Sequence, residues 1–204
     1  MENNPEIDFD YQILHLTNNF YNNYPNPPYK EILRKMDRPY NCLLIQSHYD
    51  DYFICIPYRT EISHGYSYKF TSSQRSRAHK SGLDYTKIVI VSNKDYIEAS
   101  DALVDNDEYL ETIQNIKRIV RESNDFVEEY VKHCNGENVL HQREYNRRYK
   151  YSPLKYFHNE LKINNQESTT YPESATTPQQ EVAATTEQAT TEQATTDHLS
   201  SNQD

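Results

Sequence analysis

The sequence predicts an α+β fold, in which an antiparallel sheet comes first and helices follow. Two apolar runs, Cys42–Ile45 and Phe53–Ile56, flank a short polar segment as in a β-hairpin, and a third apolar run lies within Lys87–Ser92. Later in the chain, apolar side chains recur at intervals of three and four, which is the helical period. Strand signals followed by helix signals are typical of α+β domains.

The segment before the hairpin predicts one strand. Residues 7–16 partly alternate between apolar and polar side chains and are expected to be extended. Residues 17–28 are rich in Asn, Tyr and Pro and predict a loop. Residues 29–35 predict one or two helical turns that end before Arg38-Pro39.

The hairpin has predicted strands at residues 38–47 and 52–60, with His48–Asp51 as its turn. In this register the numbers of facing residues sum to 99, so Tyr40 lies opposite Arg59. Both strands contain continuous apolar runs, which indicate burial on both faces, as in a small barrel or a sheet covered by helices.

The same register places Arg38 diagonally near Thr60. Clustered guanidinium groups next to a hydroxyl group suit a site that binds phosphate. The hairpin therefore predicts that Arg38, Arg59 and Thr60 form a phosphate-handling site at one end of the sheet.

The chain after the hairpin alternates between strand and loop signals. A short strand is expected at residues 66–70, followed by a mobile basic loop that extends to Lys80. Gly82 then predicts a turn, and Lys87–Ser92 predicts another strand.

The second half of the chain predicts helices. The period over residues 110–131 fits either one kinked helix or two, the second capped by Ser123, and Asn135-Gly136 predicts a helix end. Residues 139–149 predict a further helix. Ser152-Pro153 has the pattern of a cap and a first helical position, and predicts a last helix to about Lys162.

The C-terminal segment differs in composition from the rest. Residues 164–204 consist mainly of Thr, Glu, Gln, Ala and Ser, and the pentad Ala-Thr-Thr-Glu-Gln begins at Ala184 and again at Ala189. With no aromatic residue after Tyr171, burial does not offset the entropy of ordering, so the tail is expected to be disordered. Residues 1–163 are expected to form one domain.

The net charge of −10 is unevenly distributed. Residues 165–204 carry seven acidic and no basic side chains, whereas residues 30–94 carry eleven basic and six acidic ones. A basic block in an acidic chain is the electrostatic footprint that RNA or another polyanion uses. An ordinary solvated surface has the same charge pattern, so charge alone leaves both interpretations open.

Cysteine usage and the chain ends predict a cytoplasmic protein. Of the three cysteines, Cys42 and Cys55 lie within apolar strands, and no Cys/His spacing typical of a metal site is present. Buried, reduced thiols fit a reducing compartment. The acidic N-terminus is unlike a signal peptide, and no apolar run is long enough to span a membrane.

Three segments in order resemble a known family. Arg-Pro-Tyr-Asn-Cys-Leu-Leu-Ile begins at Arg38, Tyr-Phe-Ile-Cys-Ile-Pro-Tyr-Arg-Thr-x-Ile-x-His begins at Tyr52, and Lys-Ser-Gly-Leu-Asp-Tyr-Thr-Lys-Ile-Val-Ile begins at Lys80. Together they resemble the toxins of type III toxin–antitoxin systems, the ToxN/AbiQ-like endoribonucleases, and the TenpN branch in particular. The resemblance covers about residues 8–163.

The resemblance implies a compact, highly twisted antiparallel sheet or partial barrel of the Kid/MazF type, with flanking C-terminal helices. It also implies sequence-specific cleavage of mRNA without metal or cofactor, in a phage-defence system. The implied partner is a small repeat-derived antitoxin RNA, which the toxin processes and which inhibits it. Neither DNA nor a membrane is an expected partner.

The resemblance assigns roles to the residues at the hairpin end. Arg59 would hold the scissile phosphate, and Thr60 would bind it or orient the 2′-hydroxyl group. Arg38 would be a second phosphate clamp, Tyr40 would stack on a base, and His64 is the candidate proton shuttle. Each residue also has a structural interpretation, as a surface arginine, an ion-pair partner, a core-edge tyrosine or an exposed histidine.

Further residues are expected to support RNA binding or the fold. His79 is a weaker candidate for the proton shuttle, and Asp84 and Tyr85 are expected to fix the turn before the next strand. The residues expected to bind the RNA backbone are Arg75, Arg77, Lys80, Lys87, Arg147 and Arg148.

Two other functions remain open on the sequence. The same basic surface and the tyrosines suit a protein that binds structured RNA without cleaving it. Alternatively, the acidic helical segment 107–133 docks a basic partner, and the basic surface is incidental.

Overall fold

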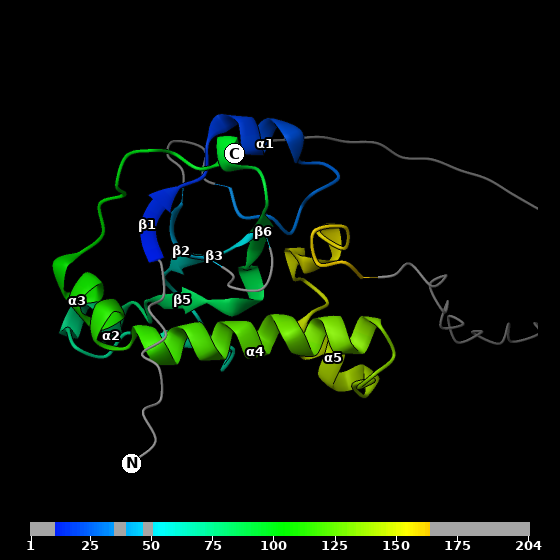
Figure 1. The fold of residues 1–204 in the computed structure, drawn as a ribbon. Helices are drawn as coiled ribbons and strands as arrows, with labels where there is room; N and C mark the ends of the chain where they lie inside the picture. Colours follow the sequence, from blue (N-terminus) through cyan, green and yellow to red (C-terminus); the bar gives the residue numbers. More distant parts are fainter. Residues whose placement is uncertain (1–10, 35–39, 47–50, 164–204) are drawn as a thin grey trace, which may run out of the picture. The chain divides into compact units, whose positions relative to one another are not determined.

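The computed structural model describes residues 11–34, 40–46 and 51–163 (Figure 1). The predicted clamp Arg38, most of the predicted hairpin turn and the predicted disordered tail lie outside the described residues.

Six strands form one antiparallel sheet, which confirms the α+β class. The strand order is β1-β2-β3-β5-β4, and β6 also pairs with β3; within the described residues the sheet is not closed into a barrel. The strands are β1 (Tyr11–His15), β2 (Asn41–Gln46), β3 (Phe53–Arg59), β4 (Ser67–Lys69), β5 (Gly82–Asp84) and β6 (Val89–Val91).

The predicted hairpin register is confirmed. β2 and β3 pair from Cys42 opposite Pro57 to Gln46 opposite Phe53, so the numbers of facing residues sum to 99. The predicted strands at residues 7–16, 66–70 and 87–92 are present as the shorter β1, β4 and β6.

β3 changes its partner halfway along its length. Its residues Phe53–Cys55 pair with β6, whereas Tyr58 and Arg59 pair with β5. Pro57 lies at the step between the two partners, where the lack of an N–H group is tolerated. The switch brings the end of β3, which carries Arg59, next to β5.

Two short helices form in segments that were predicted to be loops. In α1 (Asn18–Asn23), Thr17 caps the helix and Phe20 is buried against Tyr24 and Tyr96, so tertiary packing outweighs the loop-forming composition. In α2 (Gln74–Ala78), the Ser73 hydroxyl group accepts a hydrogen bond from the backbone N–H of Ser76.

Two further N-terminal predictions are wrong. Residues 29–34 form turns, without a helix. Gly82 does not form a turn but begins β5, where its backbone packs closely against Tyr68 of β4.

The C-terminal half contains two long helices, α3 (Asn106–Gln114) and α4 (Ile116–Cys134). They separate at Asn115, and not at Ser123, which is buried within α4 and donates its hydroxyl proton to the carbonyl oxygen of Val120. This back-bonding lets a serine remain inside a helix, and the predicted cap is therefore wrong.

The remaining helices are short. α5 (Gln142–Arg148) lies within the predicted segment 139–149, and the predicted helix end at Gly136 is confirmed by its φ of 76°. The Ser152 cap is also confirmed, but it starts only a 3₁₀ turn, η3 (Pro153–Tyr156), in place of a helix to Lys162. Two other 3₁₀ turns are η1 (Tyr85–Lys87) and η2 (Lys94–Tyr96).

The sheet is covered on opposite sides by different elements. Figure 1 shows α4 running along one side of the strands, whereas α1 lies on the other. The thiols of Cys42 and Cys55 are free and buried, as predicted, and burial raises the pKa of Cys42 to about 12. Among the described residues, no helix is both long and apolar enough to cross a membrane.

Candidate functional site

The carboxylate of Asp84 lies at the centre of the candidate site. The Asp84 side chain has no exposed surface, and its Oδ2 forms an ion pair with the guanidinium group of Arg59. Its Oδ1 accepts hydrogen bonds from the backbone N–H of Thr86 at 3.0 Å and from the Thr86 hydroxyl group at 2.6 Å. Asp84 thereby both caps η1 and holds Arg59 in place.

His64 reaches the same carboxylate from the loop between β3 and β4. Its Nε2 lies 3.4 Å from Asp84 Oδ1, and its ring stacks on Tyr66. Its Nδ1 is buried and has no hydrogen-bond partner among the described residues. Two of the predicted catalytic residues, Arg59 and His64, are thus brought together by Asp84.

The surroundings of Asp84 and Lys87 shift the pKa values of both side chains. Burial alone would raise the pKa of Asp84, but hydrogen bonds from His64, Thr86 and Arg59 outweigh it and hold the pKa below its usual value of 3.8. Asp84 is therefore ionised at neutral pH. Burial lowers the pKa of Lys87, against the opposing effect of Asp84.

The strand register explains why these residues meet. Arg59 lies opposite Gly82, and Asp84 follows two residues later in β5, so Arg59 and Asp84 share one face of the sheet. The opposite face is buried beneath α3, where the hydroxyl groups of Tyr58 and Thr112 are 2.9 Å apart. Alternation along β3 thus directs Tyr58 to the core and Arg59 to the half-exposed face.

A polar cleft of about 650 Å³ lies at the end of the hairpin. Its walls come from the start of β2, the end of β3, α2 and the start of α3. It is lined by Tyr40, Asn41, Tyr58, Arg59, Thr60, Glu61, Arg75, Ser81, Leu103, Val104, Asp105 and Glu108. Arg59 therefore borders both the cleft and Asp84.

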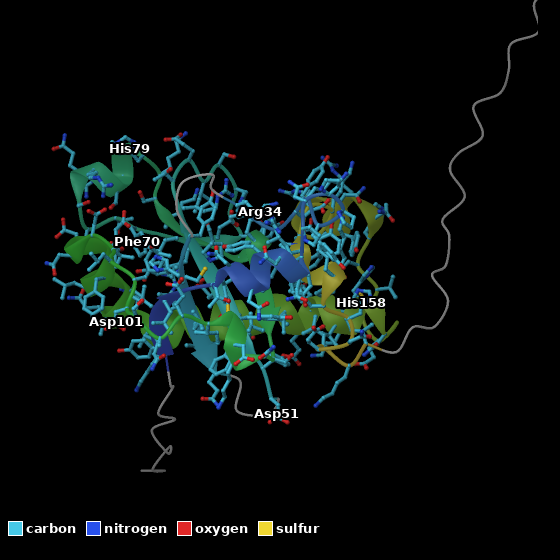
Figure 2. All side chains as sticks on the ribbon, turned by 90° about the horizontal axis from the view of Figure 1, so that it is seen from above. Arg34, Asp51, Phe70, His79, Asp101 and His158 are labelled. Carbon is cyan, nitrogen blue, oxygen red and sulfur yellow. The ribbon has the colours of Figure 1, made fainter. Side chains whose placement is uncertain are left out.

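The cleft contains three of the five predicted catalytic residues. Thr60 is exposed, Tyr40 is half-buried, and both line the cleft with Arg59. His64 is not a lining residue and joins the group only through Asp84. His79 directly follows α2 and is exposed, and Figure 2 shows it at the periphery of the described part of the molecule.

The predicted RNA-binding residues are mostly engaged within the protein. Arg75 pairs with Asp105, Arg77 donates to the carbonyl oxygen of Thr71, and Lys80 is exposed.

The C-terminal members of that set are engaged as well. Arg147 lies 3.3 Å from Glu144, and Arg148 pairs with both Glu144 and Glu129 while its guanidinium group lies over the ring of Tyr66. The Lys87 ammonium group donates to the carbonyl oxygen of Tyr151 at 2.6 Å. Neither Arg147 nor Arg148 lines the cleft, so the structure separates them from the Arg59 site.

Sequence reasoning missed the connecting residues. Asp84 was expected to fix a turn, which it does through Thr86, but its link to Arg59 and His64 depends on a pairing of β3 with β5 that no local pattern indicates. An Asp-x-Thr pattern was the available signal for the local cap. No group of three or more His, Cys, Asp or Glu residues with metal-binding geometry occurs in the described part of the chain.

Comparisons of the chain with protein-family models, with curated proteins and with solved structures found no match.

Proposed function

We propose that the protein is a metal-independent endoribonuclease toxin of a type III toxin–antitoxin system. The observation that carries the proposal is the meeting of Arg59 and His64 on the buried carboxylate of Asp84, next to a cleft that also exposes Thr60. A fixed guanidinium group, a hydroxyl group and an oriented imidazole are the parts that cleavage of an RNA phosphodiester requires.

In the proposed reaction, the 2′-hydroxyl group of the RNA attacks the adjacent phosphorus. Arg59 stabilises the negative charge that develops on the phosphoryl oxygens, and Thr60 orients the phosphate or the nucleophile. The attacking oxygen loses its proton, the bond to the 5′-oxygen breaks, and that oxygen takes up a proton. The products carry a 2′,3′-cyclic phosphate and a 5′-hydroxyl group.

His64 is the proposed carrier of a proton in this reaction. With Nε2 directed at Asp84, the carboxylate fixes the ring and leaves Nδ1 to exchange a proton. Because Nδ1 is buried in the free protein, the proposal requires the exposed Gly65 segment next to it to open, or the ring to turn, when RNA binds.

The resemblance of the hairpin and of the segment from Lys80 to the ToxN/AbiQ-like toxins supports the same proposal. The antiparallel sheet with C-terminal helices agrees with the expected architecture at the level of fold class. On this proposal the partners are the substrate mRNA and a small repeat-derived antitoxin RNA, and the twisted partial barrel of the Kid/MazF type is the finer form of the fold.

Inducible expression tests the proposal in cells. The wild-type protein is expected to stop growth and to generate RNA ends with 5′-hydroxyl groups, and co-expression of the upstream repeat region is expected to restore growth. The double variant Arg59→Ala/Thr60→Ala is expected to be harmless, since loss of one stabilising donor typically lowers a rate about 100- to 1000-fold. Equal growth inhibition by the variant would contradict the assignment.

The buried position of His64 Nδ1 favours one alternative, a protein that binds structured RNA without cleaving it. In that case, Arg59 and the cleft bind phosphate, and the histidine only holds the Asp84 carboxylate in place. Stable binding of RNA without new RNA ends, in the same variant series, would support this alternative over the enzyme.

A further inference from the structure

The contact between Arg75 and Asp105 lies at the wall of the cleft that the end of β3 also lines. Arg75 comes from α2 and Asp105 from the residue before α3, and both line the same 650 Å³ space as Arg59. Both side chains are more than half exposed, at 59% and 51%. An ion pair this exposed changes an equilibrium constant by a factor of no more than about five.

Asp105 occupies the N-cap position of α3 but does not use its side chain as a cap. Its backbone has the extended conformation of a capping residue, with φ −60° and ψ 138°, and its carbonyl oxygen accepts the first helical hydrogen bond from Tyr109. Among the described residues, its carboxylate makes no capping bond to α3 and instead binds Arg75. An aspartate at this position normally accepts a bond from an N–H of the first turn.

In this structure the Asp105 carboxylate binds Arg75 and leaves the capping role unused, and the two interactions have a similar strength. A side-chain cap changes helix stability by a factor of about five, which matches the upper value for the exposed ion pair. When another anion takes Arg75, Asp105 is free to cap α3, and the exchange costs little. Arg75 can therefore exchange Asp105 for an anionic ligand at little cost in free energy.

We propose that the cleft binds a phosphodiester group of single-stranded RNA next to the scissile one, and that Arg75 leaves Asp105 to bind it. This inference rests on the proposed function and names a second phosphate subsite of the same site. The cleft volume lies within the range of about 300–1,000 Å³ typical of ligand pockets. Arg59 and Arg75 supply its positive charge.

The acidic residues of the cleft limit the strength of this subsite. Glu108 is largely buried, accepts a hydrogen bond from the Ser76 hydroxyl group and forms a second, longer ion pair of 3.9 Å with Arg75. Glu61 is exposed to solvent. Asp105, which makes the shorter contact, is thus the main carboxylate that competes with RNA for Arg75.

A double-mutant cycle on RNA binding tests the proposal. The probe is a fluorescent single-stranded RNA with 2′-O-methyl groups, which cannot be cleaved by 2′-hydroxyl attack, and affinity is measured by anisotropy over a range of salt concentrations. Arg75→Ala is expected to weaken binding and to reduce the slope of log K against log salt by about 0.7, the value for one phosphate contact on a single strand.

Asp105→Asn is the discriminating variant. Because asparagine caps a helix as well as aspartate but does not compete for Arg75, we expect binding to strengthen by about two- to fivefold with an unchanged melting temperature. In the Arg75→Ala background the same substitution is expected to have no effect. The exposed Arg121→Ala in α4, outside the cleft, is the matched control for loss of a positive charge.

Two results would overturn the subsite. The first is weaker binding by Asp105→Asn, because it would mean that the carboxylate itself contacts the RNA. The second is an Arg75→Ala variant that binds RNA with the same affinity and salt slope as Arg121→Ala, because Arg75 would then make no contact with the RNA. If the binding results of the double-mutant cycle are as expected but the protein does not cleave RNA, only the enzymatic proposal is contradicted, since the probe measures binding alone.

Discussion

Asp84 links the residues that the sequence singled out. A buried carboxylate needs partners, and it has them in Arg59, His64 and Thr86. The sequence identified Arg59 and His64 as separate candidates, because each has a recognisable chemistry. It did not identify their common partner, because Asp84 meets them only through the pairing of β3 with β5.

Asp84→Asn is expected to change the acid stability of the protein. A group whose pKa is lowered on folding contributes stability above its unfolded pKa, and this contribution is lost as the pH falls through the folded pKa. The wild type should therefore lose more unfolding free energy than the variant when the pH drops from 7 to below 3.8. Urea unfolding at pH 7 and pH 3 measures both; equal losses would contradict the ion-pair assignment.

His64→Gln tests the proton-carrier role separately from the structural one. Glutamine retains a hydrogen-bond donor for Asp84 but cannot carry the proton in the reaction, so cleavage should slow by about 100- to 10,000-fold while the fold is retained. The measurements are the initial rate of cleavage and the melting temperature of each variant. His79→Gln, at the exposed residue after α2, is the control and should retain the wild-type rate.

At the scale of elements, the hairpin was predictable and its surroundings were not. Continuous apolar runs and a short polar turn set the register of β2 and β3, and the structure has that register. α1 and α2 were missed because each is short and depends on one cap and on packing, as with Thr17 and Phe20. The boundary at Asn115, where the backbone leaves the helical conformation with φ −114° and ψ 13°, was also missed, because the apolar period continues across it.

Gly82→Ala is expected to disturb the strands that carry the site. A Cβ atom at Gly82 would lie 2.2 Å from the carbonyl oxygen of Tyr68, so β4 and β5 must move apart. Overpacking of this kind costs roughly 1–3 kcal/mol of unfolding free energy. Asp84, two residues further along β5, would move with the strand, and cleavage should fall as well.

Gly65→Ala is the matched control for this substitution. A Cβ atom at Gly65 has no heavy atom within 4 Å, so its effect on the unfolding free energy should stay within about 0.5 kcal/mol. Chemical denaturation of both variants provides the comparison. Similar stability of the two variants would contradict the close approach of β4 and β5.

At the scale of the whole molecule, most of the net negative charge of the chain comes from its C-terminal segment. Seven of the acidic side chains lie in residues 165–204, so a chain that ends at residue 163 has a formal net charge of −3 in place of −10. Within the described residues, many cations are already paired, as Arg75 is with Asp105 and Arg148 is with Glu129. RNA binding must therefore compete with internal carboxylates.

Truncation after Ile163 is expected to strengthen RNA binding at low salt. The removed charges repel a polyanion over a distance set by screening, which is about 30 Å at 0.01 M salt and about 8 Å at 0.15 M. The gain in affinity should therefore shrink as salt is added, while the melting temperature stays unchanged. Anisotropy titrations at both salt concentrations test this, and an equal gain at both would contradict an electrostatic origin.

The central claim is that the site around Arg59, His64 and Asp84 cleaves RNA by attack of the 2′-hydroxyl group without a metal ion. The most direct measurement incubates the purified protein with end-labelled single-stranded RNA in EDTA and identifies the new ends. We predict fragments with a 2′,3′-cyclic phosphate and a 5′-hydroxyl group, and no fragments with Arg59→Ala/Thr60→Ala. Intact RNA, or fragments that end in a 5′-phosphate, would contradict the account.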